Sequence, residues 1–260
     1  MIEYRVLVHV ISLAGAGLVA FGCSGAESTM AEEGPAESVQ SPIINGSPDT
    51  HEAVVGTYTG SSLCTGTIVS TKGTTGYVLT AAHCCESDSP PTQVRIGADF
   101  RAAKVYQVKS VLAHASYTGS PGSSYDFCMV SFNDSDGNMK VIPALPPELN
   151  TVKAGDTLDA VGYGRTETEP HGATNLALKR LHVTYKVKAF SSSGLKTDFD
   201  ATQGGTCEGD SGGPDLVTVN GKTYVYGIHS TVDTYDCNNT STSGVVSKVS
   251  TWIQDFISHN

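Results

Sequence analysis

The sequence has little positive charge. Its 260 residues include 16 Lys and Arg against 26 Asp and Glu, which gives a formal net charge of −10, and basic residues form no run anywhere in the chain. Proteins that bind nucleic acid neutralise phosphates with clustered Lys and Arg. We therefore exclude nucleic acid as a partner, and we assign the acidity to a solvated surface.

Long apolar runs are also absent beyond the N-terminus. The run Val6–Phe21 follows a short polar start that ends at Arg5, and it falls short of the roughly 20 residues of a membrane-spanning helix. This pattern is typical of an export signal, which we place over residues 1–22. Two alternatives remain for the next step: ordinary cleavage after Gly22, or lipidation of Cys23 as in a bacterial lipoprotein. We expect an exported protein that is secreted, periplasmic or lipid-anchored at the cell surface, with membrane contact only through a lipid on Cys23.

Residues 23–42 are rich in Ser, Glu, Ala, Gly and Pro and contain little to bury, which predicts an acidic propeptide or tether. From residue 43 onward, short apolar runs with strand-like alternation are separated by turn residues, which predicts an all-β fold. The expected strands are 54–58, 66–70, 77–81, 93–96, 104–112, 127–132, 157–163, 179–187, 215–219, 223–229 and 244–249. Apolar residues at helical spacing over 249–258 predict a C-terminal helix.

Two short motifs contain the residues of a nucleophile and a base. Ser211 lies in Gly-Asp-Ser-Gly-Gly-Pro (209–214), and His83 lies in Thr-Ala-Ala-His-Cys (80–84). A serine hydroxyl is a poor nucleophile unless a base lies within hydrogen-bond reach and a third group orients that base. Asp126 lies between the two motifs, directly before an apolar strand pattern. The glycines around Ser211 leave room for a sharp turn and for a substrate carbonyl to approach backbone N–H groups.

These motifs and the order His, Asp, Ser resemble the trypsin/chymotrypsin family of serine endopeptidases, in a bacterial secreted member, from about Ile43 to the C-terminus. The resemblance implies two six-stranded antiparallel β-barrels, about 43–145 and 146–248, with a C-terminal α-helix over about 249–258 that packs on the second barrel. The whole protease domain is then 43–260. Ser211 would attack the peptide carbonyl, His83 would move the proton, and Asp126 would orient His83. The N–H groups of Gly209 and Ser211 would form the oxyanion hole, and Ser230 would support Asp126.

The resemblance also implies an activation step. After cleavage, the new amine of Ile43 would pair with the buried carboxylate of Asp210. The residues before Ile43 are Gln40-Ser41-Pro42, which offer no Lys or Arg to a trypsin-like activator. We therefore expect another activating protease or an autocatalytic route. The expected partners are protein or peptide substrates and that activating protease, and we expect a monomer.

Seven cysteines are present, and removing Cys23 leaves an even number, which suits an oxidising compartment. The resemblance implies the disulfides Cys64–Cys84 and Cys207–Cys237. Cys85 and Cys128 each follow a triad residue by two positions, so a formed triad brings them together. We predict a third disulfide between them; the alternative is two buried free thiols.

The resemblance places Gly205, Val232 and Gly244 around the pocket for P1, the substrate residue before the cut. Gly205 stands where trypsins have an aspartate, which excludes Arg and Lys at P1. Val232 is similar to elastase-like members and favours a small aliphatic residue. Thr206 and His229 resemble the pocket of glutamate-specific members, because a hydroxyl and an imidazole can both donate to a carboxylate. The prediction is Glu or a small aliphatic residue at P1, with His229 as a core histidine the alternative interpretation.

The stretch 97–108 is too short for the family's calcium loop and lacks its paired acidic residues, so we expect no metal, and nothing in the sequence indicates a cofactor. A catalytically silent binding protein on the same fold is the competing function. The presence of His83, Asp126 and Ser211 together favours the enzyme.

Overall fold

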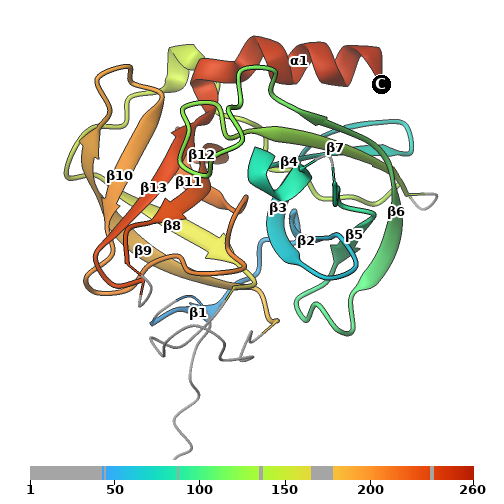
Figure 1. The fold of residues 1–260 in the computed structure, drawn as a ribbon, viewed down its shortest axis with the longest axis horizontal. Coiled ribbons are helices and arrows are strands. Elements are labelled where there is room, and N and C mark those ends of the chain that lie inside the picture. The colour runs from blue at the N-terminus through green and yellow to red at the C-terminus, as the bar shows by residue number, and fades with distance from the viewer. Residues whose placement is uncertain (1–42, 44, 87, 135–136, 165–177, 235–236) are drawn as a thin grey trace, which may run out of the picture. The chain divides into compact units, whose positions relative to one another are not determined.

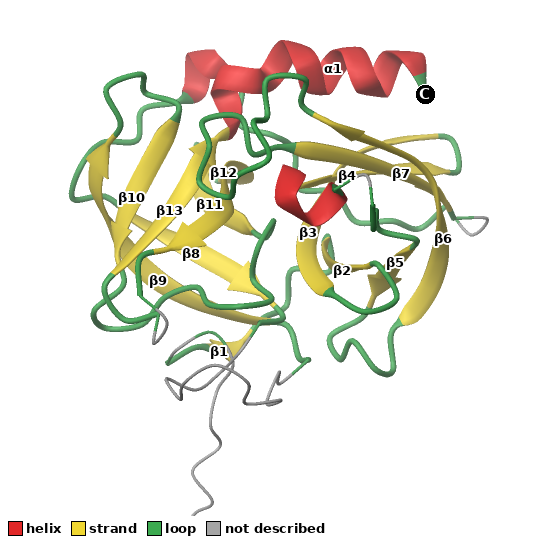
Figure 2. Cartoon of the chain, viewed as in Figure 1, coloured by secondary structure: helices red, strands yellow, loops and turns green. Residues whose placement is uncertain are grey.

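A computed structural model describes residues 43, 45–86, 88–134, 137–164, 178–234 and 237–260. The expected signal peptide over 1–22, the tether over 23–42 and the lipidation candidate Cys23 lie outside the described residues. Within the described part, antiparallel strands are followed by a C-terminal helix (Figures 1 and 2). No helix in this part has both the length and the apolar character needed to cross a membrane.

The first half of the chain forms a closed barrel. Its strands follow the order β2-β3-β4-β7-β6-β5, and every pair is antiparallel. Valine, isoleucine and phenylalanine side chains fill the interior, where β-branched and aromatic residues pack well on a pleated surface. The strands are β2 (Val54–Tyr58), β3 (Leu63–Lys72), β4 (Thr75–Thr80), β5 (Gln93–Ile96), β6 (Lys104–Ala113) and β7 (Cys128–Asn133).

The second half forms another closed ring. β8 pairs with both β11 and β9, so the order β8-β9-β10-β13-β12-β11 closes on itself, and the short β1 (Ser47–Pro48) adds to β9. The expected fold of two six-stranded antiparallel barrels with a C-terminal helix is confirmed. The strands are β8 (Thr157–Gly162), β9 (Leu181–Phe190), β10 (Lys196–Asp200), β11 (Pro214–Val219), β12 (Lys222–Val232) and β13 (Thr240–Val245). Three 3-10 turns, η1 (Ala82–Cys85), η2 (Pro147–Leu149) and η3 (Val246–Val249), and helix α1 (Ser250–His259) complete the chain.

Two strand expectations differ from the structure. β10 was not expected, because its sequence Lys-Thr-Asp-Phe-Asp buries only one large apolar side chain, Phe199. The strand expected over 244–249 is wrong beyond Val245, where η3 begins. A short apolar run has no periodicity that separates a strand from a 3-10 turn.

Helix α1 packs against the first barrel, which corrects the expectation that it packs on the second. The ring of Phe256 meets that of Tyr77 on β4 edge-on, with centroids 6.2 Å apart. Trp252 lies 5.0 Å from the ring of His114, which directly follows β6. Phe256 is buried and Trp252 is partly buried in these contacts. Helix α1 therefore leads the chain from the end of barrel two to the surface of barrel one.

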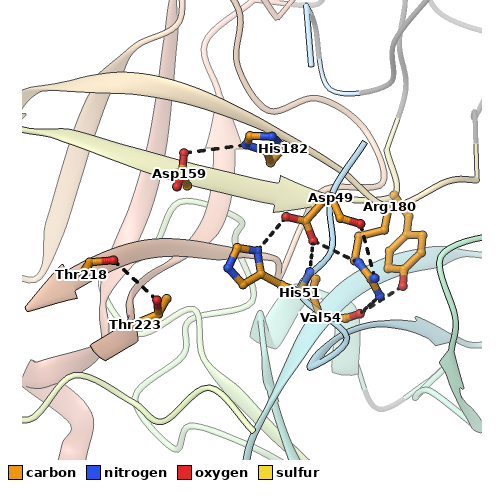
Figure 3. A network of polar contacts seen from close by, with 9 residues as sticks. Asp49, His51, Val54, Asp159, Arg180, His182, Thr218 and Thr223 are labelled. Carbon is orange, nitrogen blue, oxygen red and sulfur yellow. Dashed lines mark hydrogen bonds and ion pairs between the residues drawn. The ribbon is translucent and has the colours of Figure 1, made fainter. Parts of the chain in front are cut away.

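A buried polar network fixes the start of the folded chain to β9 (Figure 3). Arg180, one residue before β9, donates from Nε to Asp49 Oδ1 over 3.1 Å and from Nη1 to the carbonyl of Val54 over 3.2 Å. His51 Nδ1 lies 2.7 Å from Asp49 Oδ2. Burial by itself would raise the pKa of Asp49, but the hydrogen bonds and charge of His51 and the charge of Arg180 outweigh it and lower that pKa. The segment around β1 is therefore held by charge as well as by strand pairing.

Candidate active site

The turn that carries Ser211 precedes β11 and depends on glycine. Gly209 and Gly212 have φ of 92° and 79°, a region that favours glycine. A side chain at Gly212 would collide with Thr80 of barrel one. Asp210 N donates to Cys207 O and Gly213 N donates to Asp210 O, whereas within the described residues the amides of Gly209 and Ser211 have no protein acceptor. These two N–H groups are thus available to a ligand.

His83 and Asp126 are brought together by η1 and by the start of β7. Asp126 is 1% exposed, and its Oδ2 lies 2.8 Å from His83 Nδ1, while its Oδ1 accepts the backbone N–H of His83 over 2.9 Å. Ser230 Oγ donates to Asp126 Oδ2 over 2.5 Å. Burial acts to raise the pKa of Asp126, but the bonds and charge of His83 and the hydroxyl of Ser230 outweigh it and lower that pKa. Asp126 is therefore held as a carboxylate that fixes one nitrogen of His83.

His83 and Ser211 both line one cavity of about 650 Å³. His83 comes from barrel one and Ser211 from barrel two, so the cavity lies where the barrels meet. A nucleophile, an imidazole and a buried carboxylate that orients the imidazole are the groups needed for acyl transfer. The other lining residues are Pro121, Thr206, Cys207, Glu208, His229, Ser230, Thr231, Val232, Asp233, Thr234 and Cys237.

The described residues form three disulfides, and their pairings are those that the sequence analysis expected. Cys64–Cys84 ties β3 to η1, and Cys85–Cys128 ties η1 to β7. The second of these joins the segment of His83 to the segment of Asp126. Cys207–Cys237 braces the cavity wall beside Val232. The described residues contain one close group of metal-ligating types, Cys64, His83 and Cys84, but its two sulfurs are bonded to each other and are not thiolate ligands.

The walls of the cavity differ in part from the expected pocket. Thr206, Val232 and His229 line it, but Gly205 and Gly244 lie outside the lining. A Cβ on Gly244 would lie 2.5 Å from the ring of Phe127, so this glycine serves packing behind Asp126.

Ser241 is a site residue that the sequence analysis missed. It is buried, and its Oγ accepts a hydrogen bond from Thr206 Oγ1 over 3.0 Å. A Cβ on Gly205 would lie 3.4 Å from the same oxygen. Ser241 therefore lies behind the lining residue Thr206.

His229 is buried and has both ring nitrogens engaged. Nε2 lies 3.0 Å from Asp215 Oδ1, and Nδ1 lies 3.2 Å from the carbonyl oxygen of Asp210. Tyr185 on β9 donates its hydroxyl to the same oxygen of Asp215. Burial by itself would lower the pKa of His229, but the charge and hydrogen bond of Asp215 outweigh it and raise that pKa. No sequence motif indicated Asp215 or Tyr185.

Asp210 is fully buried beside the nucleophile. Its Oδ1 accepts the N–H of Gly164 over 2.8 Å and its Oδ2 accepts that of Cys207 over 2.9 Å. Burial dominates and raises the pKa of Asp210 to about 6. The side chain of Ile43 is also buried, but the hydrogen bonds of the described residues include none between Ile43 and Asp210. Their pairing in a cleaved chain stays a prediction.

Comparison with known proteins identifies the family to which this fold belongs. The family model described as Trypsin matches residues 43–257, and the chain belongs to the trypsin family. It is a serine-type endopeptidase, its substrates are proteins or peptides, and its disulfides fit an exported protein.

Three relatives illustrate the range of similarity. The chain is 28% identical to the bovine (Bos taurus) chymotrypsin-like elastase family member 1, over 76% of this chain and 79% of that protein. It is 31% identical to trypsin 5G1 of Aedes aegypti, over 59% of this chain and 61% of the relative. It is 29% identical to the human (Homo sapiens) hepatocyte growth factor activator serine protease, over 83% of this chain but only 36% of that longer protein.

Proposed function

We propose that this chain is an exported endopeptidase that cleaves peptide bonds through an acyl-enzyme on Ser211. The observation that carries the proposal is the contact between His83 Nδ1 and the buried carboxylate of Asp126, beside a cavity that His83 shares with Ser211. Ser211 Oγ attacks the carbonyl carbon while His83 takes the hydroxyl proton and then passes it to the leaving amine. Water then attacks the ester carbonyl while His83 takes a proton from it. The histidine passes that proton to the Ser211 oxygen, and the acyl group leaves as the acid product.

The amides of Gly209 and Ser211 would bind the oxyanion that forms in each half of this reaction. Each such donor is worth about 3 kcal/mol of transition-state stabilisation. Asp126 would stay ionised and stabilise the cationic form of His83. Ser230 would hold Asp126 in place through its hydroxyl.

We propose a small aliphatic residue at P1, in preference to Glu. A carboxylate needs hydrogen-bond donors, but His229 has both nitrogens engaged and Thr206 donates to Ser241. The lining also includes Glu208 and Asp233, whose charges oppose an acidic side chain. Arg and Lys are disfavoured at P1 because residue 205 is a glycine and offers no carboxylate to a basic substrate side chain.

Activation would follow cleavage before Ile43, whose new amine would pair with Asp210. Residues 1–22 would act as signal peptide and 23–42 as propeptide or tether, with Cys23 as the candidate lipid site, and 43–260 would form the protease.

The test is P1 profiling with a mixed peptide library. Pro42→Lys provides a cleavage site, so the full chain can fold and then be cut before Ile43 by trypsin, which is removed and inhibited before the assay. Cleavage after Ala or Val that disappears in Ser211→Ala supports the proposal. Cleavage after Glu would reassign Thr206 and His229 to substrate binding. A folded, cut chain without Ser211-dependent cleavage of any peptide would instead support the catalytically silent binding protein.

A further inference from the structure

We infer that His229 is a positioning residue, held by Asp215 and Tyr185, that orients the peptide bond between Asp210 and Ser211. This role rests on the proposed function, because that peptide bond contains the N–H of Ser211. The carbonyl of the same peptide bond is the group that His229 contacts. The inference assigns His229 to the nucleophile turn and not to recognition of the substrate side chain.

The geometry of one peptide unit carries the argument. A peptide bond is planar and trans, so its C=O and N–H point in opposite directions. The carbonyl of Asp210 accepts hydrogen bonds from Gly213 N over 2.8 Å and from His229 Nδ1 over 3.2 Å. Fixing that carbonyl fixes the direction of the Ser211 N–H, which has no protein acceptor within the described residues. Hydrogen bonds to a carbonyl also polarise the N–H of the same peptide unit and strengthen it as a donor.

The donors and acceptors determine the protonation of His229. A carbonyl oxygen can only accept, so Nδ1 carries a hydrogen. Nε2 faces Asp215 Oδ1, an oxygen that also accepts the hydroxyl of Tyr185. Because that oxygen acts as an acceptor, Nε2 carries a hydrogen too. The arrangement is an imidazolium bound to a buried carboxylate, with Asp215 fully buried and His229 2% exposed.

Glycines in the surrounding backbone leave space for the side chains of His229 and Asp215. A side chain at Gly227 would collide with the carboxylate of Asp215, and a Cβ on Gly213 would lie 3.0 Å from His229 Nδ1. The titratable groups around the imidazole are Asp215 on β11, Asp210 in the nucleophile turn and Tyr185 on β9, while β13 places the uncharged Ser243 opposite. Asp215 is the acid that contacts the ring directly.

The kinetic test uses Asp215→Asn and His229→Gln in the Pro42→Lys chain, cut after folding. His229→Gln keeps a donor near Asp215 but removes the donor toward the Asp210 carbonyl. We therefore expect kcat to fall about 10- to 100-fold, which is less than the fall expected when an oxyanion-hole donor is removed entirely. KM should change less than about threefold, because the substrate pocket is intact. A KM increase without loss of kcat would return His229 to substrate binding.

Asp215→Asn adds a pH signature that a merely structural residue would not give. Without the carboxylate, the pKa of His229 should fall as its charged partner is lost. The neutral ring can then keep its one hydrogen on Nε2, toward the amide oxygen of the substituted side chain, so that Nδ1 no longer donates to the Asp210 carbonyl as pH rises. The ratio of variant to wild-type kcat should then decrease between about pH 6 and pH 8. A ratio that is constant with pH overturns the inference.

Two tyrosine variants distinguish the contacts that link Tyr185, Asp215 and His229 from general packing. Tyr185→Phe removes the hydroxyl that contacts Asp215, and Tyr226→Phe removes another buried hydroxyl of barrel two, bonded to Thr197 over 2.6 Å. The inference expects lower kcat in the first variant and near wild-type kcat in the second. Equal losses in both variants would contradict it.

Nuclear magnetic resonance tests the same geometry without catalysis, in the uncut full chain. With 15N-labelled histidine, His229 should show hydrogens on both ring nitrogens at neutral pH, and Asp215→Asn should abolish this. His229→Gln should shift the Ser211 amide resonance. A neutral ring with hydrogen only on Nε2, or an unchanged Ser211 amide, overturns the inference even if the proposed protease activity fails.

Discussion

Thr65 on β3 donates its backbone N–H to the carbonyl oxygen of Ser211 over 2.9 Å. Its hydroxyl donates to the carbonyl of Gly209, also over 2.9 Å, and accepts the N–H of Tyr163 over 3.2 Å. One residue of barrel one therefore holds both ends of the tripeptide Gly209–Ser211, which contains the proposed nucleophile and the proposed oxyanion-hole amides. The conformation of this turn in barrel two thus depends on a side chain of barrel one.

Thr65→Val should weaken the enzyme through this contact. The substitution keeps the volume and the backbone bond but leaves the Gly209 carbonyl and the Tyr163 amide without the hydroxyl, which costs about 1–3 kcal/mol of unfolding free energy. We expect kcat to fall roughly 10-fold. Thr67→Val is the matched control, since Thr67 is equally buried and its hydroxyl has no hydrogen-bond partner among the described residues. Equal effects of the two variants in denaturant unfolding and kinetics would contradict this role.

Asp210 should make the uncut chain less stable as pH rises. Its folded pKa of about 6 lies above its ordinary value of 3.8, so the folded state holds the proton more tightly than the unfolded state does. The stability from this group is complete below about pH 4 and is lost as pH rises through about 6. Between about pH 4 and pH 7, wild type should lose about 3 kcal/mol more than Asp210→Asn. Urea unfolding at several pH values measures the difference, and parallel curves would refute it.

The disulfide Cys85–Cys128 should support both stability and catalysis. It closes a separation of 43 residues and joins the segments that carry His83 and Asp126. Replacing both cysteines with alanine should lower the free energy of unfolding by about 2–4 kcal/mol and reduce kcat more than KM. The double variant Cys207→Ala with Cys237→Ala is the comparison, because it should act mainly on KM through the cavity wall. The reverse pattern would show that the disulfide does not hold His83 and Asp126 together.

Arg180→Met should destabilise the start of the folded chain. It leaves the carboxylate of Asp49 buried without its guanidinium, and breaking a buried pair in this way costs about 3–5 kcal/mol. Lys179→Met, an adjacent exposed position, is the control and should change stability little. Thermal unfolding distinguishes them. A near-neutral Arg180→Met would mean that His51 alone satisfies Asp49.

Val232→Gly should widen the substrate pocket. Val232 lines the cavity and packs beside the Cys207–Cys237 disulfide, so its removal should shift the P1 preference from Ala or Val toward Leu and Phe. A difference of one or two methylenes corresponds to about 10- to 200-fold in kcat/KM. The peptide-library profile of the two proteins gives the answer, and an unchanged profile would place the P1 side chain away from Val232.

Alternation and turn residues alone predict an all-β fold. The two barrels, the disulfides Cys64–Cys84 and Cys207–Cys237 and the meeting of His83 with Asp126 were predicted from the family resemblance of two short motifs, and the third disulfide followed from that meeting. The links from His229 to Asp215 and Tyr185 could not be predicted, because they join three strands through side chains that no motif connects. Ser241 was missed because its contact with Thr206 joins β13 to a residue outside any strand, and the packing of α1 was predicted wrongly because its apolar face does not show which barrel it meets.

The hydroxyl of Tyr163, just beyond β8, bonds to the carbonyls of Val54 and Gly97 in barrel one, over 3.0 and 2.6 Å. The carbonyl of Val54 belongs to β2 and that of Gly97 directly follows β5, so this hydroxyl joins barrel two to two segments of barrel one. Such a contact opposes hinge motion between the barrels, and we expect turnover to proceed without closure of one barrel on the other. Two barrels made as separate polypeptides would lack this contact of Tyr163 until they meet. Their reassembly should therefore restore folding and hydrolysis together.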